Sequence, residues 1–125
     1  MKLALGHGTF AEKAGGELLL LLNIDTIVTP GWIGRLAHHI QSDPSIGLIC
    51  PVTNFAGNEA KINVRYSNCG EMLIFAQNLS SEKYGERSEV RVAPLFCALL
   101  TRAVWNQVGN LDTRFAVGMF EDDDY

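Results

Sequence analysis

Cysteine is scarce in this sequence, and the few cysteines are placed in a way that excludes two classes of small protein. The 125 residues contain three of them, Cys50, Cys69 and Cys97. The number is odd and no two form a Cys-x-x-Cys pair, so we expect neither a disulfide scaffold nor a zinc knuckle. This usage indicates a reducing compartment such as the cytoplasm, with the thiols serving as buried apolar side chains.

Long hydrophobic segments and runs of basic residues are also missing. Apolar runs such as Leu18–Leu22 are far shorter than the roughly 20 residues of a transmembrane helix. The opening residues 1–5 are too few for a signal peptide. The net charge is −4, and the lysines and arginines are scattered singly. A nucleic-acid partner is therefore not expected, because a phosphate backbone requires a basic stripe.

The composition that remains is that of an ordinary folded domain. Hydrophobic residues make up 47% of the sequence and charged residues 19%, which excludes a disordered chain. A length of 125 residues suits one domain, and a chain of this size buries roughly two-thirds of its unfolded surface. Residues 1–125 contain no internal repeat, low-complexity segment or linker.

Apolar runs and helical repeats alternate along the chain. Residues 17–22 are apolar without alternation, which predicts a strand covered on both faces. A helix should follow, with Thr29 as its cap, Pro30 in its first turn and Asp43-Pro44 at its end. The remaining predicted elements are a short strand over 46–50, a loop over 52–59, a short strand over 62–66, a helix over 71–84, a strand over 90–101 broken at Pro94, and a helix over 102–108 ended by Gly109. This order predicts a layered α/β domain.

Asp25 is a candidate functional residue because it comes just after the leucine-rich strand. In an open α/β sheet, ligands bind at the carboxyl ends of the strands. Mg²⁺ and Mn²⁺ take oxygen ligands, usually one or two carboxylates together with substrate phosphates. Asp25 therefore suits a divalent metal site. The alternative is that its side chain only caps the turn that leads to Thr29 and Pro30.

The acidic run at the end of the sequence is the second candidate. Glu121, Asp122, Asp123 and Asp124 follow one another directly. Adjacent carboxylates repel unless a cation or a helix N-terminus lies near them. The run therefore either begins a helix or supplies a general base that takes a proton from a hydroxyl. An EF-hand calcium loop is a poor alternative, because its acids alternate and it needs an internal glycine, whereas the acids here are consecutive.

Residues 6–11 (GHGTFA) raise a different possibility, a dinucleotide-binding domain. They match Gly-x-Gly-x-x-Gly/Ala, and Asp25 follows about 20 residues later, as this fingerprint requires. The helix after the glycines would have to end before Gly15-Gly16. Two turns are too few for the usual crossover of a dozen or more residues, which counts against this hypothesis.

The 52–59 loop (VTNFAGNE) offers three polar side chains, Asn54, Asn58 and Glu59. Amide and carboxylate groups pair well with hydroxyls, so these residues suit contacts to a sugar. Plain turn chemistry is the equal alternative, because asparagine and glycine are also the residues that form turns.

Several blocks of the sequence, in the right order, resemble the family 2 glycosyltransferases with a GT-A fold. Residues 14–17 (AGGE), the apolar strand and residues 23–25 (NID) are similar to the family's A-x-G-E opening, strand and N-x-D or D-x-D ending. The further similar blocks are 26–32, 43–48, 51–59, 102–105, 108–112, 114–115 and 118–125. The likeness covers residues 14–125, and it rests on the order of the blocks more than on any one of them.

The resemblance implies a truncated, three-layer GT-A-like α/β fold with a mixed sheet and flanking helices. It implies inverting transfer of a sugar from a nucleotide-diphosphate donor to a hydroxyl of a saccharide or another acceptor. Asp25 would bind the Mg²⁺ or Mn²⁺ that bridges the diphosphate, and Asn23 would lie near the donor. Asp122, or else Glu121, would be the base. A role in polysaccharide biosynthesis, in the cytoplasm or peripherally at the inner membrane face, is implied by the same resemblance.

The resemblance is partial. The family's first strand and its loop for the nucleotide base have no counterpart, residues 1–13 are an atypical N-terminal segment, and nothing follows the acidic run. We therefore expect a partial domain over residues 1–125, with weak activity or none in isolation. A catalytically inactive remnant that acts as a binding or assembly module is the alternative. A missing strand would leave an exposed sheet edge, and such an edge favours a homo-oligomer.

Overall fold

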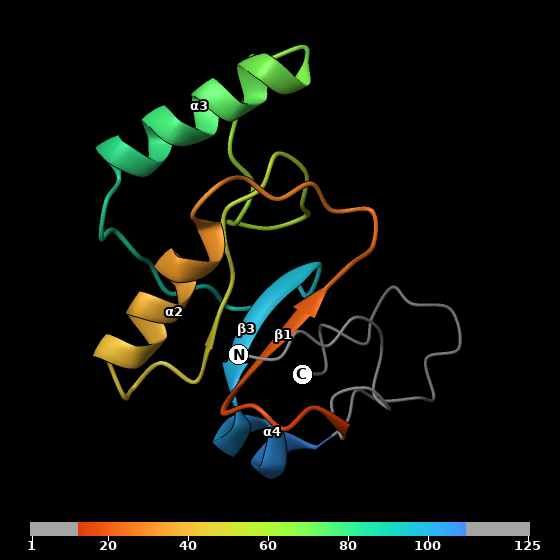
Figure 1. The fold of residues 1–125 in the computed structure, drawn as a ribbon, viewed down its shortest axis with the longest axis vertical. Helices are drawn as coiled ribbons and strands as arrows, with labels where there is room; N and C mark the ends of the chain where they lie inside the picture. Colours follow the sequence, from red (N-terminus) through yellow and green to blue (C-terminus); the bar gives the residue numbers. More distant parts are fainter. Residues whose placement is uncertain (1–12, 110–125) are drawn as a thin grey trace.

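The computed structural model describes residues 13–109, which form a small α/β fold (Figure 1). The elements in chain order are β1 (Leu18–Leu22), α2 (Trp32–Ser42), β2 (Leu48–Ile49), α3 (Cys69–Glu82), β3 (Cys97–Thr101) and α4 (Arg102–Val108). The strands and helices confirm the α/β class predicted from the sequence. The mixed sheet implied by the resemblance is not found among the described residues, where both strand pairings are antiparallel.

The sheet has three strands in the order β1-β3-β2. The central strand β3 is antiparallel to both neighbours, and Leu99 lies opposite Leu20 of β1 and Ile49 of β2. Because β1 and β2 are both antiparallel to β3, they run in the same direction. Their carboxyl ends therefore lie at the same end of the sheet, which is the feature that positions the candidate site.

Both faces of the sheet are covered, as the uninterrupted leucines of β1 predict. Helix α2 covers one face, and Trp105 of α4 packs on the other. The buried residues on the α2 face are Leu20, Leu36, Ile40, Cys97 and Leu99, and those on the α4 face are Leu19, Leu21, Leu100 and Trp105. The core is thus built from the strands, with one helix contributing to each face.

β1 and β2 are the two edge strands of the described sheet, and they differ in exposure. Leu19 and Leu20 have no exposed surface, whereas Leu48 and Ile49 of the opposite edge strand β2 are only partly buried. A homo-oligomer stays a prediction, and if it forms through a sheet edge, β2 is the more accessible strand.

The start of α2 differs from the expectation. The cap residue is Gly31, with φ 80°, and no side chain caps the helix, so Thr29 does not have the expected capping role. The Thr29 carbonyl instead accepts a hydrogen bond from the Trp32 N–H at 3.3 Å. Pro30 and Gly31 therefore occupy the central positions of a turn, where proline first and a positive-φ glycine second are the preferred pair. The end of α2 at Asp43 is as expected.

Two expected strands are shorter and one does not form. The strand expected over 46–50 is reduced to Leu48–Ile49, and the strand expected over 90–101 is reduced to Cys97–Thr101. Pro94 has no N–H to give to a ladder, which accounts for the late start of β3. Residues 62–66 are not a strand. The Ile62 N–H donates to the Thr53 carbonyl at 2.8 Å. No ladder of backbone hydrogen bonds continues from it over residues 63–66 within the described part of the chain.

Helix α3 is well capped but poorly buried. The Asn68 side chain accepts a hydrogen bond from the Glu71 N–H at 3.0 Å, and the Ser67 N–H donates to the Glu71 carboxylate at 2.8 Å. This arrangement resembles a capping box, except that the Glu71 carboxylate bonds to Ser67, the residue before the cap Asn68. The helix starts two residues before the expected 71. No residue of α3 is buried. None of the helices between residues 13 and 109 has the length and apolar character needed to cross a bilayer.

The three cysteines are free and differ in exposure. Burial in the core raises the pKa of Cys97 to about 12, and the nearby Cys50 adds to this shift. Burial also raises the pKa of Cys50, which is partly buried. Both thiols therefore stay protonated and unreactive near neutral pH. The buried apolar role is confirmed for Cys97 and is wrong for Cys69, which is exposed at the start of α3.

Acid should loosen the start of α3. Hydrogen bonds from the backbone N–H and hydroxyl of Ser67 hold the pKa of Glu71 below its ordinary value. A carboxyl whose pKa is depressed by folding stabilises the fold above its unfolded pKa, and this contribution is lost as pH falls through the folded pKa. We expect the amide protection factors of the first turn of α3 to fall below about pH 4. Hydrogen exchange followed by NMR measures them.

Glu71→Gln isolates the effect of protonating Glu71 from the effects of acid on other groups. Glutamine still offers an oxygen to Ser67, but it does not titrate. The variant should therefore show the same protection in the first turn of α3 above and below about pH 4. Persistence of the wild-type acid response in Glu71→Gln would mean that another group is responsible.

Gly47 occupies a close approach between the start of β2 and α4. A Cβ placed on Gly47 would lie 2.5 Å from Cγ2 of Val104. Gly47→Ala should therefore lower the free energy of unfolding by about 1–3 kcal/mol, the usual cost of overpacking. Urea denaturation measures this change. Gly57→Ala is the matched control, because nothing lies within 4 Å of its added Cβ, and it should change stability by no more than about 0.5 kcal/mol. Equal losses of unfolding free energy in the two variants would contradict a close approach at Gly47.

Candidate functional site

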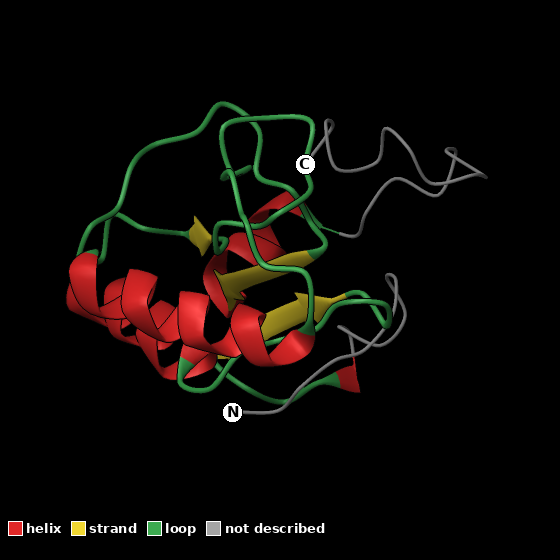
Figure 2. Ribbon diagram, turned by 90° about the horizontal axis from the view of Figure 1, so that it is seen from above, coloured by secondary structure: helices red, strands yellow, loops and turns green. Residues whose placement is uncertain are grey.

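The exits of β1 and β2 and the start of β3 lie together at one end of the sheet. The Asn23 N–H donates to the Phe96 carbonyl at 2.8 Å, which joins the residue after β1 to the residue before β3. The segment that leaves β2 starts at the same end, because β1 and β2 run in the same direction. We call residues 23–28, 51–61 and 94–96 the exit end. Figure 2 views the molecule from this side and shows long loops around the ends of the strands.

Asp25 occupies a corner of a tight turn at the exit end. The Thr26 N–H donates to the Asn23 carbonyl at 3.2 Å, so Ile24 and Asp25 are the two central residues of this turn. Both side chains are exposed. No hydrogen bond or ion pair joins the Asp25 carboxylate to any residue from 13 to 109. The alternative role, a cap for the turn before α2, thus has no hydrogen bond to support it, and the carboxylate is open to a ligand.

The backbone of Asn23 makes hydrogen bonds that hold the exit end together, and its side chain is exposed. Its N–H and carbonyl are both used, in the bonds to Phe96 and Thr26. Its side chain makes no hydrogen bond to another described residue. Asn23 and Asp25, both predicted from the sequence, therefore lie on a hydrogen-bonded turn with their amide and carboxylate groups accessible.

The three polar residues of the 52–59 loop have different tasks. The Asn58 side chain donates to the Val92 carbonyl at 2.9 Å and accepts from the Ala60 N–H at 3.1 Å. Asn58 therefore holds the loop in place, and only part of its hydrogen-bonding capacity remains for a substrate. Asn54 and Glu59 are exposed. These two side chains are the better candidates for contacts to a sugar.

The exit end supplies few metal ligands. Across residues 13–109, no three side chains of histidine, cysteine, aspartate or glutamate come together as a metal site. A single carboxylate fits Mg²⁺ or Mn²⁺ when phosphate oxygens and water complete the coordination, since these ions are commonly held by one or two carboxylates and a substrate. It does not fit a metal held by the protein alone. The predicted base residues Glu121 and Asp122, like the glycines at 6–11, lie outside the described residues.

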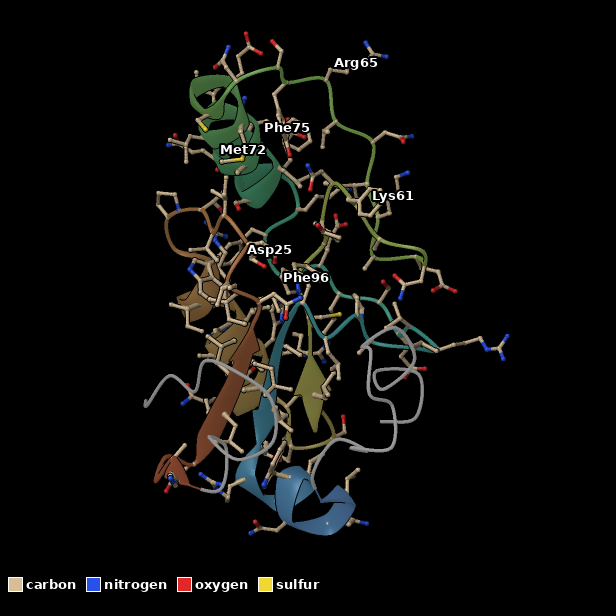
Figure 3. The ribbon with its side chains drawn as sticks, turned by 90° about the vertical axis from the view of Figure 1, so that its right-hand side faces the viewer. Asp25, Lys61, Arg65, Met72, Phe75 and Phe96 are labelled. Atoms are coloured by element: carbon tan, nitrogen blue, oxygen red, sulfur yellow. The ribbon has the colours of Figure 1, made fainter. Side chains whose placement is uncertain are left out.

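Helix α3 contributes residues that sequence reasoning missed. Figure 3 shows Met72 and Phe75 on the side of α3 that faces the exit end, where Asp25 and Phe96 lie. Phe75 also meets the ring of Tyr66 edge-on, with centroids 5.6 Å apart. The helical spacing of these residues was visible in the sequence. Nothing in that spacing indicates that the helix stands over an aspartate so far away along the chain.

A hollow of about 560 Å³ lies at the opposite end of the sheet and contains none of the candidate residues. Its lining includes Gly16, Gln41 and Arg102. The Arg102 side chain donates to the carbonyls of Gly16 and Ala14. This arginine therefore fixes the segment before β1 and does not offer a free cation to a ligand.

No protein-family model, curated protein sequence or solved structure matches this chain. The case for a function therefore depends on the sequence blocks and on the geometry of the exit end.

Proposed function

We propose that the chain is a GT-A-like glycosyltransferase domain, which transfers a sugar from a nucleotide-diphosphate donor to a hydroxyl acceptor with inversion. The observation that carries the proposal is the Asp25 carboxylate, which is exposed and unpaired among residues 13–109 at the exit end. In open α/β sheets, ligands bind beyond the carboxyl ends of the strands, and Asp25 follows the carboxyl end of β1, which runs in the same direction as β2. The ordered sequence blocks around it support the same assignment.

Asp25 would hold the donor through Mg²⁺ or Mn²⁺ that arrives with the diphosphate. A bound divalent ion neutralises charge that builds up on the leaving diphosphate. The hydrogen-bonded turn at 23–26 fixes the backbone that carries the carboxylate, and positioning of reacting groups is a large part of the catalysis of group transfer. The Asn23 amide, exposed on the same turn, would donate hydrogen bonds to the ribose or phosphate of the donor.

The base remains a proposal from the sequence, with Asp122 preferred to Glu121. Thirteen residues, 110–122, lead from Gly109 to Asp122, and an extended chain of that length spans at most about 45 Å. The five residues of β3 are about 17 Å long. The chain is therefore long enough to return from α4 to the exit end. There the carboxylate would take the proton of the acceptor hydroxyl as that oxygen attacks the anomeric carbon and the donor diphosphate leaves.

An inactive binding module is the second candidate. The exit end has Asp25 and Glu59 as its carboxylates, and no three histidine, cysteine, aspartate or glutamate side chains gather within residues 13–109. Such a site suits binding of a donor that brings its own metal. The two candidates share the donor site and differ in whether sugar is transferred.

Equilibrium dialysis of UDP, GDP and dTDP against the full chain tests the proposal. We expect at least one of them to bind in the presence of Mn²⁺ and to bind much more weakly without it. Release of nucleotide diphosphate from the matching nucleotide sugar then separates an enzyme from a binding module. Absence of metal-dependent binding for all three nucleotides would refute the proposal, and metal-independent binding of NAD would favour the dinucleotide alternative.

A further inference from the structure

The inner face of α3 is apolar, regularly spaced and only half covered. Its partly buried residues recur at helical spacing, and they are Met72, Phe75, Ala76, Leu79 and Ser80. A helix of a small domain normally buries such a stripe in the core, yet no residue of α3 is buried. The outward-facing neighbours Leu73 and Ile74 are 42% and 62% exposed. These side chains therefore point toward the exit end, but the exit end covers only part of their surface.

Arg35 of α2 holds α3 in this position. Its guanidinium Nη1 donates to the Ser80 carbonyl at 3.0 Å and lies 5.4 Å from the centre of the Tyr84 ring. The neighbouring Leu36 and Ile40 of α2 are buried against the sheet, so Arg35 extends from a firmly anchored helix. Near the middle of α3, the Phe75 ring meets the Tyr66 ring edge-on.

We infer that the inner face of α3 is the acceptor wall of the exit end, that it takes the C–H face of a saccharide ring, and that Arg35 is the residue that positions it. This inference rests on the proposed function. Met72 and Phe75 face the exit end, where Asp25 would hold the donor. An acceptor between the helix and that end would have its hydroxyls near the donor sugar.

The chemistry of the surroundings favours a saccharide over a lipid chain. A sugar ring has an apolar C–H face and a rim of hydroxyls. Phe75 and Met72 supply an apolar and aromatic surface for the C–H face of the sugar. The exposed Asn54 and Glu59 of the exit end supply hydrogen-bonding partners for its hydroxyls. Binding sites for small ligands commonly combine apolar walls with a few polar groups in this way.

The methyl group of Met72 is a suitable probe, because it belongs to the only methionine between residues 13 and 109. The full chain labelled with methyl-¹³C methionine would be saturated with Mg²⁺ and the nucleotide diphosphate that binds it. The methyl glycosides of glucose, galactose and N-acetylglucosamine would then be titrated in. We expect at least one glycoside to shift the Met72 signal in a saturable way.

Phe75→Ala and Ile74→Ala form a matched pair on adjacent positions of the same helix. Phe75→Ala should weaken the glycoside affinity about tenfold, because it removes the aromatic surface. Ile74→Ala changes an outward residue and should leave that affinity within about twofold. Both variants should bind the nucleotide diphosphate as the wild type does. Equal glycoside affinities in the two variants would overturn the inference.

Arg35→Ala and Arg35→Lys test the positioning role. Arg35→Ala should lower the amide protection of α3, leave that of β1 and β3 unchanged, and weaken glycoside binding. Arg35→Lys keeps one donor for the Ser80 carbonyl and should restore part of both properties. Loss of protection in α3 without loss of glycoside affinity would overturn the role of Arg35.

The outcomes separate this inference from the proposed function. A chain that binds nucleotide diphosphate with metal but shows no Met72 response to any of the three glycosides overturns the acceptor wall alone. A chain that binds no nucleotide diphosphate overturns the proposed function and the acceptor wall together.

Discussion

Asp25→Asn should weaken metal-dependent binding of a nucleotide diphosphate by about a hundredfold or more. Asp25 is an exposed carboxylate on a hydrogen-bonded turn at the exit end, and Mg²⁺ and Mn²⁺ are bound chiefly through charged oxygens. Asparagine has nearly the same shape but no charge. Because the Asp25 side chain makes no hydrogen bond to residues 13–109, the substitution should leave the fold intact. Isothermal titration calorimetry with Mn²⁺ and the nucleotide measures the effect.

Asp43→Asn is the matched control for this loss of charge. The Asp43 carboxylate accepts hydrogen bonds from the hydroxyl and N–H of Ser45 and pairs with Arg87. The bonds from Ser45 hold the pKa of Asp43 below its ordinary value. This carboxylate lies at the end of α2 and not at the exit end. Its replacement should leave nucleotide affinity unchanged, so similar losses in both variants would point to net charge and not to a metal site at Asp25.

Leu99→Ala should cost about 2–5 kcal/mol of the free energy of unfolding, the range observed for buried leucines. Leu99 has no exposed surface, lies on the central strand and is opposite Leu20 and Ile49 of the two edge strands. A cavity here would remove contacts from all three strands and from α2. Since small domains are stable by only about 5–15 kcal/mol, this one substitution should shift the urea midpoint strongly.

Leu73→Ala is the control, because it makes the same replacement of leucine by alanine outside the core. Leu73 lies on α3, is 42% exposed and belongs to no buried cluster. Alanine is also the better helix former. We expect a change of about 0.5 kcal/mol or less, as for most surface substitutions. A loss at Leu73 equal to that at Leu99 would contradict the placement of the core in the sheet.

Strong local signals predicted the order and type of the helices and strands correctly, apart from the strand expected over 62–66. The uninterrupted leucines of β1 and the helix that ends at Gly109 formed where expected. The predictions that were wrong concern the cap of α2 and the strand over 62–66. Thr29 is a good cap by residue type, but proline and glycine after it form a turn that places Gly31 at the helix start. Residues 62–66 have strand-like residues, yet no neighbouring strand of the described part pairs with them.

The site was predictable only where it depends on one strand and the residues after it. Asp25 follows β1 directly, so its place at the end of the sheet follows from local sequence. The antiparallel position of β3 between β1 and β2, which brings Phe96 to Asn23, depends on pairing between distant segments. Met72 and Phe75 lie over the exit end on a helix that Arg35 of α2 contacts through the Ser80 carbonyl, and no local sequence signal indicates this contact.

The measurement that tests the central claim most directly is a titration of the full chain with Mn²⁺, followed by NMR, with and without UDP, GDP and dTDP. If Asp25 is a donor site, one nucleotide should tighten Mn²⁺ binding, and the paramagnetic ion should broaden the signals of residues 23–26 most strongly. If Mn²⁺ broadens only the acidic run at 121–124 and no nucleotide changes its affinity, the assignment of Asp25 as a donor site is wrong.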